Sequence, residues 1–128
     1  VSTLGCDRQG NTYNIHGDTA AAWIAGELGA ERLIMMTDIA GVLRDKDDIT
    51  TLIPDITVSE AVELFSKGVI SGGMIPKVEC CIEAIDSGVK KVIIMDGRVP
   101  HSILMELLTD EGAGTMVRAD NSEESEAD

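Results

Sequence analysis

Three short glycine-bearing turns lie at the ends of expected helices and strands. They are His16-Gly17-Asp18, Asp38-Ile39-Ala40-Gly41 and Ser71-Gly72-Gly73-Met74. Glycine lets backbone N–H groups close on a phosphate, and the N-terminus of a helix favours negative charge, so such turns suit a phosphate ligand. The sequence contains neither GxxxxGK[ST] nor GxGxxG, and each turn taken singly is more often a plain chain reversal.

Charged side chains beside these turns leave two interpretations open. Lys77 lies one turn into the helix expected after Gly72-Gly73, so its ammonium can reach that N-terminus, yet its helical neighbours are apolar. It is either a phosphate ligand or a lysine whose stem covers apolar surface. Asp18 is favoured as the cap of a helix. Asp38 follows an apolar run and either binds a metal or ribose or satisfies its own loop.

The histidines and cysteines form no catalytic pattern. His16 and His101 have no third group at the spacing of a metal site or a triad, which favours structural roles. The three cysteines, Cys6 and the adjacent Cys80-Cys81, make neither an even disulfide framework nor a CxxC pair. The adjacent pair is therefore expected to pack inertly, and the chain is expected to be cytoplasmic.

Hydrophobic patterning predicts the elements that position these residues. A hairpin is expected over 1–7 and 12–15, and a helix over 19–28 that ends at Gly29. The apolar run 32–37 is typical of a strand covered on both faces. Residues 39–55 look like a loop, whose charges at 45–48 are expected to be solvated.

The second half of the chain predicts three further helices and two strands. Thr57 or Ser59 can cap a helix that closes at Lys67-Gly68. A helix after Gly72-Gly73 carries an apolar stripe and ends at Gly88. Strands at 91–95 and 114–117 enclose a helix at 101–108, and 119–128 form an acidic tail expected to be disordered. The stripe consists of Met74, Val78, Cys81, Ile82 and Ile85. The order predicts an α/β fold, a three-layer α-β-α sandwich with a mainly parallel sheet.

Composition excludes several classes of partner. The chain of 128 residues carries 10 Lys+Arg against 23 Asp+Glu, a formal net charge of -13. Such an acidic surface repels polyanions, so neither nucleic acid nor an anionic membrane is an expected partner. No apolar run approaches the ~18 residues that cross a bilayer.

Five stretches between Asn11 and Val117, in unbroken order, resemble the amino-acid kinase family. They are residues 13–21, 28–43, 72–79, 96–102 and 109–116. The first two are similar to the nucleotide-binding half of these enzymes, and the other three resemble the acetylglutamate kinases among them.

The resemblance implies transfer of the ATP γ-phosphoryl group to the side-chain carboxylate of N-acetyl-L-glutamate in arginine biosynthesis, with ATP and Mg²⁺ required. By similarity, Lys77 stabilises the transition state, Asp18 organises the catalytic lysines and Asn14 contacts acetylglutamate. Residues 1–118 correspond to a nucleotide-binding portion of the kinase domain, and no residue is expected to bind a metal directly. The ATP-lining residues implied are Asp38, Ile39, Ala40, Gly41, Val42, Leu43, Val69, Ile70, Ser71, Gly72 and Gly73.

The resemblance also implies what the chain lacks. The family's first half, with a glycine-rich phosphate loop, a second lysine and most of the acetylglutamate pocket, has no counterpart here, so the chain alone is expected to be inactive. The complete enzymes are homo-oligomers, and the stretch 101–114 resembles that of arginine-inhibited members. His16-Gly17 stands where the family usually has Asn-Ala.

Alternatives from other classes remain. A related amino-acid kinase acting on aminoadipate is slightly favoured by Gly17-Asp18, whereas residues 73–77 favour acetylglutamate. A non-catalytic nucleotide-binding or regulatory fragment is predicted to bind ATP without turnover. A purely structural fragment is predicted to bind no nucleotide.

Overall fold

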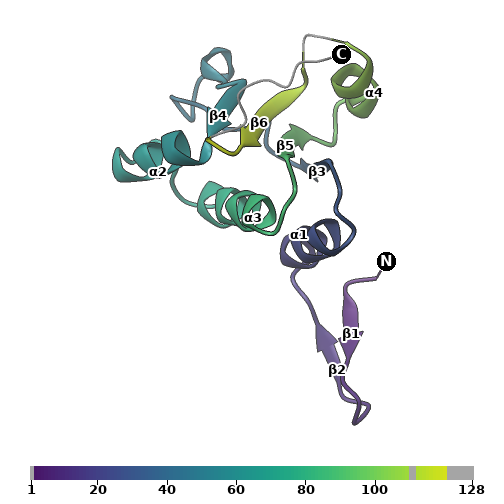
Figure 1. The fold of residues 1–128 in the computed structure, drawn as a ribbon. Helices are drawn as coiled ribbons and strands as arrows, with labels where there is room; N and C mark the ends of the chain where they lie inside the picture. Colours follow the sequence, from purple (N-terminus) through teal and green to yellow (C-terminus); the bar gives the residue numbers. More distant parts are fainter. Residues whose placement is uncertain (1, 110–111, 121–128) are drawn as a thin grey trace.

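The computed structural model describes residues 2–109 and 112–120. A hairpin leads into an α/β body, and the hairpin extends away from that body (Figure 1). The elements are β1 (Leu4–Cys6), β2 (Thr12–Asn14), α1 (Gly17–Glu27), β3 (Arg32–Thr37), a 3-10 helix (Ile49–Thr51), β4 (Asp55–Thr57), α2 (Val58–Ser66), α3 (Met74–Asp86), β5 (Lys91–Asp96), α4 (Ser102–Leu108) and β6 (Gly114–Arg118).

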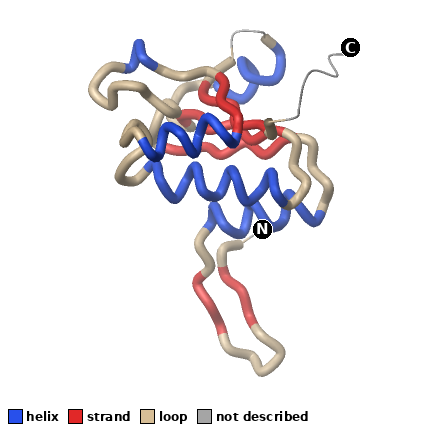
Figure 2. The backbone as a smooth tube through the Cα atoms, turned by 60° about the vertical axis from the view of Figure 1, so that its left-hand side comes forward, coloured by secondary structure: helices blue, strands red, loops and turns tan. Residues whose placement is uncertain are grey.

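The main sheet has the strand order β3-β5-β6-β4. β3 pairs with β5 in parallel, β4 pairs with β6 in parallel, and only β5 with β6 is antiparallel. Helices α1, α2 and α3 lie on one face of this sheet, and α4 lies on the other (Figure 2). The predicted α/β class, with a mainly parallel sheet flanked by helices, is confirmed.

The central strand explains why its sequence is apolar throughout. In β5, the four residues Val92 to Met95 are each 0% exposed, so both faces of the strand are covered. The same expectation is wrong for β3, which has a similar sequence but lies at the edge of the sheet. There Met36 is 51% exposed.

Helices α1 and α3 run side by side in the same direction, as three contacts show, which follow one another in the same order along both helices. Lys77 Nζ lies 3.4 Å from Asp18 Oδ2 near their N-termini. One level further along, the indole N–H of Trp23 donates to Glu83 Oε1 at 3.2 Å. At the far end a Cβ on Gly26 would lie 2.7 Å from Ser87 Cβ, so glycine permits the close approach.

Helix boundaries agree with the predictions except at one cap. The predicted capping role of Asp18 is wrong, because the helix begins at Gly17 and His16 is the N-cap, without a side-chain capping bond. The Asp18 carboxylate instead faces Lys77. Of the two candidates for α2, Thr57 is the cap: its hydroxyl accepts from the Glu60 N–H, and the Glu60 carboxylate accepts from the Thr57 N–H.

The segment predicted as loop contains more structure than expected. β4 ends it, and the 3-10 helix lies within it, while its charged residues 45–48 are exposed as predicted. The predicted tail lies outside the described residues from 121 onwards. Asp120 is described, and its carboxylate accepts a hydrogen bond from the Ser59 N–H at 2.9 Å.

Candidate nucleotide site

The glycine-bearing turns of the main body gather at one edge of the sheet. α1 is followed directly by β3, and α3 by β5, and each helix packs against the sheet that contains its following strand. A helix linked so closely to its strand runs opposite to it, so the helix N-termini lie at the carboxyl ends of β3 and β5. This edge is where open α/β sheets bind ligands.

Lys77 and Asp18 meet at this edge from two different helices. Lys77 is the fourth residue of α3, and Asp18 is the second residue of α1. Their side chains are 21% and 29% exposed, respectively. Since both groups are partly withdrawn from water, each orients the other more firmly than an exposed pair would. One ammonium is thus held at a fixed place beside the N-terminus of α3.

The N-terminus of α3 is open towards solvent. Gly73 is the N-cap and offers no side-chain cap. In the described part of the chain, neither Gly72 nor Gly73 donates its N–H to an acceptor, and no atom lies within 4 Å of a Cβ built at either residue. Gly72 has φ +57°, a conformation that favours glycine. The N–H groups, the helix dipole and Lys77 together form a cationic corner suited to a phosphate.

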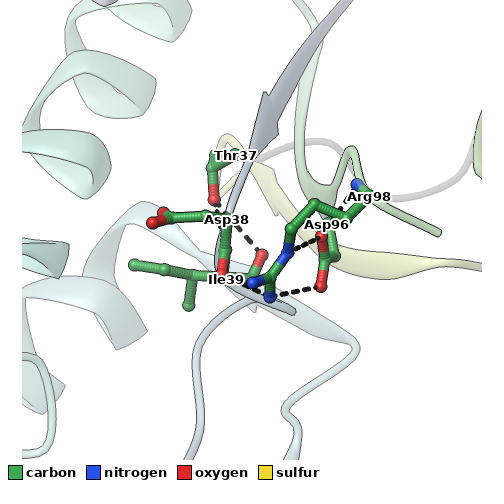
Figure 3. A network of polar contacts seen from close by, with 5 residues as sticks. All are labelled: Thr37, Asp38, Ile39, Asp96 and Arg98. Atoms are coloured by element: carbon green, nitrogen blue, oxygen red, sulfur yellow. Dashed lines mark hydrogen bonds and ion pairs between the residues drawn. The ribbon is translucent and has the colours of Figure 1, made fainter.

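The segment 38–43 continues from the carboxyl end of β3 and is anchored at both ends. The Arg98 guanidinium donates to the Asp38 carbonyl through Nη2 at 2.8 Å (Figure 3). At the other end, the Val42 N–H donates to Thr115 Oγ1 at 2.9 Å. The Thr115 hydroxyl is 0% exposed and donates in turn to the Ile53 carbonyl at 2.7 Å.

Several residues expected to line the ATP pocket contribute their side chains to the core instead. Val42 is 1% exposed and Ile70 is 2% exposed. Any contact of these two residues with a nucleotide must therefore use the main chain. Two grooves near this region, of about 280 and 430 Å³, include none of the expected ATP-lining residues in their walls. Role assignments for 38–43 and 69–73 therefore stay predictions.

Two further candidates lie outside α1 and α3, the helices that form this corner. Asn14 is exposed at the end of β2 in the hairpin. His101, the N-cap of α4, has φ +60° and makes no side-chain capping bond. Within residues 2–109 and 112–120, no cluster of three or more His, Cys, Asp or Glu side chains is arranged to hold a metal.

The cysteine pair packs as predicted. Burial raises the pKa of the Cys81 thiol to about 12, and burial is also the main cause that raises the pKa of Cys80. Cys81 Sγ contacts Met35 Sδ at 3.8 Å in the core. A thiol held protonated in this way is a poor nucleophile at neutral pH.

Sequence reasoning missed two residues of this region, Arg98 and Thr115. Asp96 is the last residue of β5, and Asp38 directly follows β3, so the sequence places two carboxylates at the same end of the sheet. This second carboxylate was a usable signal for Arg98, two residues further on. In the sequence, Thr115 is one polar residue within a predicted strand, and this pattern alone predicts no particular hydrogen-bond partner.

The fold agrees with the comparisons to known proteins. The model of the amino acid kinase family matches residues 1–96, and the chain belongs to that family. An acetylglutamate kinase of Brachyspira hyodysenteriae is 58% identical over 120 residues, covering 94% of this chain and 42% of the relative. One from Clostridioides difficile is 50% identical over 121 residues, with the same two coverages. The chain thus spans about two fifths of the length of these relatives.

Solved structures give the same fold. An N-acetylglutamate synthase from Neisseria gonorrhoeae, complexed with coenzyme A and L-arginine, is 30% identical with a TM-score of 0.83, over 92% of this chain and 27% of that one. A carbamate kinase from Giardia lamblia bound to AMP-PNP has a TM-score of 0.66 at 22% identity, over 91% of this chain and 41% of that one, and supports the fold alone. Among the described residues, no helix has the length and apolar character needed to cross a bilayer.

Proposed function

We propose that this chain is the ATP-side portion of an acetylglutamate kinase, which transfers the γ-phosphoryl group of ATP to the side-chain carboxylate of N-acetyl-L-glutamate in arginine biosynthesis. The observation that carries the proposal is Lys77 beside the open N-terminus of α3, held by Asp18 from α1 at 3.4 Å. The similarity to relatives named acetylglutamate kinase supports the choice of acceptor.

Different residues would bind the phosphates and stabilise the transition state of phosphoryl transfer. The carboxylate of the acceptor is already ionised at neutral pH, so no general base is needed. Catalysis then depends on positioning and on neutralising the charge of the phosphoryl group in flight. Lys77 supplies the positive charge, and Asp18 fixes where that charge lies. The N–H groups of Gly72 and Gly73 supply further donors to phosphate oxygens.

The described residues suit a nucleotide phosphate better than a bare metal ion. Unpaired N–H groups and an ammonium are donors, which match phosphate oxygens. No carboxylate cluster in residues 2–109 or 112–120 is arranged to hold Mg²⁺. The ion would therefore be bound largely through the phosphates themselves, where it neutralises charge. Residues 38–43 and 69–71 would contact the nucleotide mainly through their backbone.

Most of the acetylglutamate pocket would lie beyond this portion. Asn14, exposed in the hairpin, would contact acetylglutamate, and the remaining contacts would come from the part of the relatives that this chain does not match. Such a kinase would be a homo-oligomer when complete. Arginine would act as a feedback inhibitor at the stretch 101–114. Support for this role comes from the arginine complex of the structurally similar synthase.

The test is a coupled assay of acetylglutamate-dependent ADP release. The chain is assayed alone and after mixing with the unmatched part of the B. hyodysenteriae relative. We expect no turnover alone and measurable turnover in the mixture. In that mixture Lys77→Ala should lower kcat at least about tenfold, equivalent to roughly 1.4 kcal/mol of barrier. Nucleotide binding without turnover in any mixture supports the regulatory alternative, and an unchanged rate with Lys77→Ala rejects the role of this lysine.

A further inference from the structure

We infer that Arg98 is a positioning residue for nucleotide binding, which holds residues 38–43 in the shape that receives the nucleotide. This inference rests on the proposed function, since it assumes that the segment contacts ATP. Arg98 lies in the turn after β5, 60 residues along the chain from Asp38, and it joins the ends of two neighbouring parallel strands (Figure 3).

The guanidinium is held in one orientation by Asp96. Arg98 Nε donates to Asp96 Oδ1 at 3.0 Å, and Nη2 donates to Asp96 Oδ2 at 2.9 Å. The Arg98 backbone N–H also donates to Asp96 Oδ1 at 2.9 Å. These contacts lower the pKa of Asp96 and raise that of Arg98, so the pair stays charged at neutral pH. A planar fork bound at two points is a rigid donor.

The guanidinium contacts one peptide unit of the segment, the one between Asp38 and Ile39. Arg98 Nη2 also donates to the Asp38 carbonyl oxygen at 2.8 Å. The N–H of the same peptide unit, which belongs to Ile39 and points the opposite way, donates to Thr37 Oγ1 at 2.8 Å. Because a peptide unit is planar, holding its oxygen and its N–H from opposite sides fixes the direction in which the chain leaves β3.

The rest of the segment has few other constraints before Val42. Among the described residues, the N–H groups of Ala40 and Gly41 have no acceptor. The next anchor is the bond from the Val42 N–H to Thr115. Thr37 Oγ1 also donates to the Ile39 carbonyl at 3.2 Å, so the direction of the Ala40 N–H depends on Thr37 as well as on the peptide plane that Arg98 holds. Donors of this kind are what a nucleotide requires from a backbone.

Exposure separates this role from general stabilisation. The Arg98 side chain is 70% exposed and that of Asp96 is 17% exposed, so solvent reaches the pair from the arginine side and its contribution to global stability is small. Loss of Arg98 should therefore disturb the local segment and leave the fold intact. Lysine cannot replace it, because one ammonium cannot grip both carboxylate oxygens while it reaches a carbonyl.

The experiment measures ATP affinity by calorimetry, and amide exchange of Ile39 by NMR, on the whole 128-residue chain. The variants are Arg98→Ala, Arg98→Lys and Asp96→Asn. Arg32→Ala is the matched control, since it removes the same charge from an exposed site at the opposite end of β3. If the unanchored segment adopts its binding shape about a tenth of the time, Arg98→Ala raises the Kd for ATP about tenfold.

We expect Arg98→Lys to behave like Arg98→Ala, with faster Ile39 exchange in both and a Tm within about 3 °C of wild type. Arg32→Ala should bind ATP like wild type. Asp96→Asn distinguishes positioning from direct contact: it weakens binding if Arg98 positions the segment, and strengthens it if a freed Arg98 binds phosphate itself. Wild-type affinity in Arg98→Ala, or tighter binding in Asp96→Asn, overturns the inference. Absence of ATP binding by the wild-type chain overturns the proposed function as well.

Discussion

Replacing Thr115 by valine tests whether one buried hydroxyl holds the segment that follows β3. The hydroxyl accepts from the Val42 N–H at 2.9 Å and donates to the Ile53 carbonyl at 2.7 Å, and the residue is 0% exposed. Valine has nearly the same shape but satisfies neither group. Each buried polar group left unpaired costs about 1–3 kcal/mol.

The opposing gain is small. A methyl group in place of the hydroxyl contributes about 1 kcal/mol of apolar burial. Because two such groups lose their partner, we expect Thr115→Val to lower the free energy of unfolding by about 1–5 kcal/mol, a substantial share of the ~5–15 kcal/mol typical of a domain. Thr115→Ser is the matched control, because it keeps the hydroxyl and loses only a methyl, at about 1 kcal/mol.

The assay is urea unfolding of both variants, followed by the fluorescence of Trp23, the one tryptophan of the chain, and by circular dichroism. Valine favours strands more than serine does, so propensity alone would rank the variants the other way. A serine variant at least as unstable as the valine variant would refute the role assigned to the hydroxyl.

Three further outcomes follow from the fold. Gly26→Ala should destabilise the protein by about 1–3 kcal/mol, because the new Cβ meets Ser87; a gain of about 1 kcal/mol, as in an exposed helix, would show that α1 and α3 do not pack closely. Hydrogen bonds, of which that from the Asn11 side chain has the largest effect, lower the pKa of Asp7 from 3.8 to about 2. The stabilisation of the folded state by ionised Asp7 is therefore complete above pH 4 and is lost as the pH falls towards 2. An NMR titration that gives Asp7 an ordinary pKa would contradict this. Iodoacetamide at pH 8 should alkylate Cys6 in the folded chain, and Cys81 only after denaturation, as read by mass spectrometry; equal rates would contradict the burial of Cys81.

Local patterns predicted most of the elements because their signals lie within a few residues. Helix α2 has its cap and its terminal glycine in one short stretch, and the structure confirms both. β4 has no such signal, since three residues after Pro54 become a strand only by pairing with β6, where Ile56 faces Val117. That partner lies about half the chain away, so no periodicity in the local sequence predicts the strand.

The candidate site was predicted unevenly for a similar reason. Spacing placed Lys77 near a helix N-terminus but left its role open, and only the packing of α1 against α3 brings it to Asp18. The error over the cap of α1 arose because His16, Gly17 and Asp18 can each begin a helix, and local sequence does not fix a boundary to one residue. Arg98 was missed because its partners are a carboxylate beside it and a carbonyl 60 residues away.

The most direct test of the central claim is the affinity of the chain for ATP with Lys77 removed. Calorimetric titration with MgATP compares wild type, Lys77→Ala and the control Lys90→Ala, which removes the same charge from an exposed position beyond the other end of α3. We predict that Lys77→Ala weakens binding at least about tenfold, or roughly 1.4 kcal/mol, and that Lys90→Ala binds like wild type. Equal affinities in the wild type and Lys77→Ala would contradict a phosphate site at the N-terminus of α3.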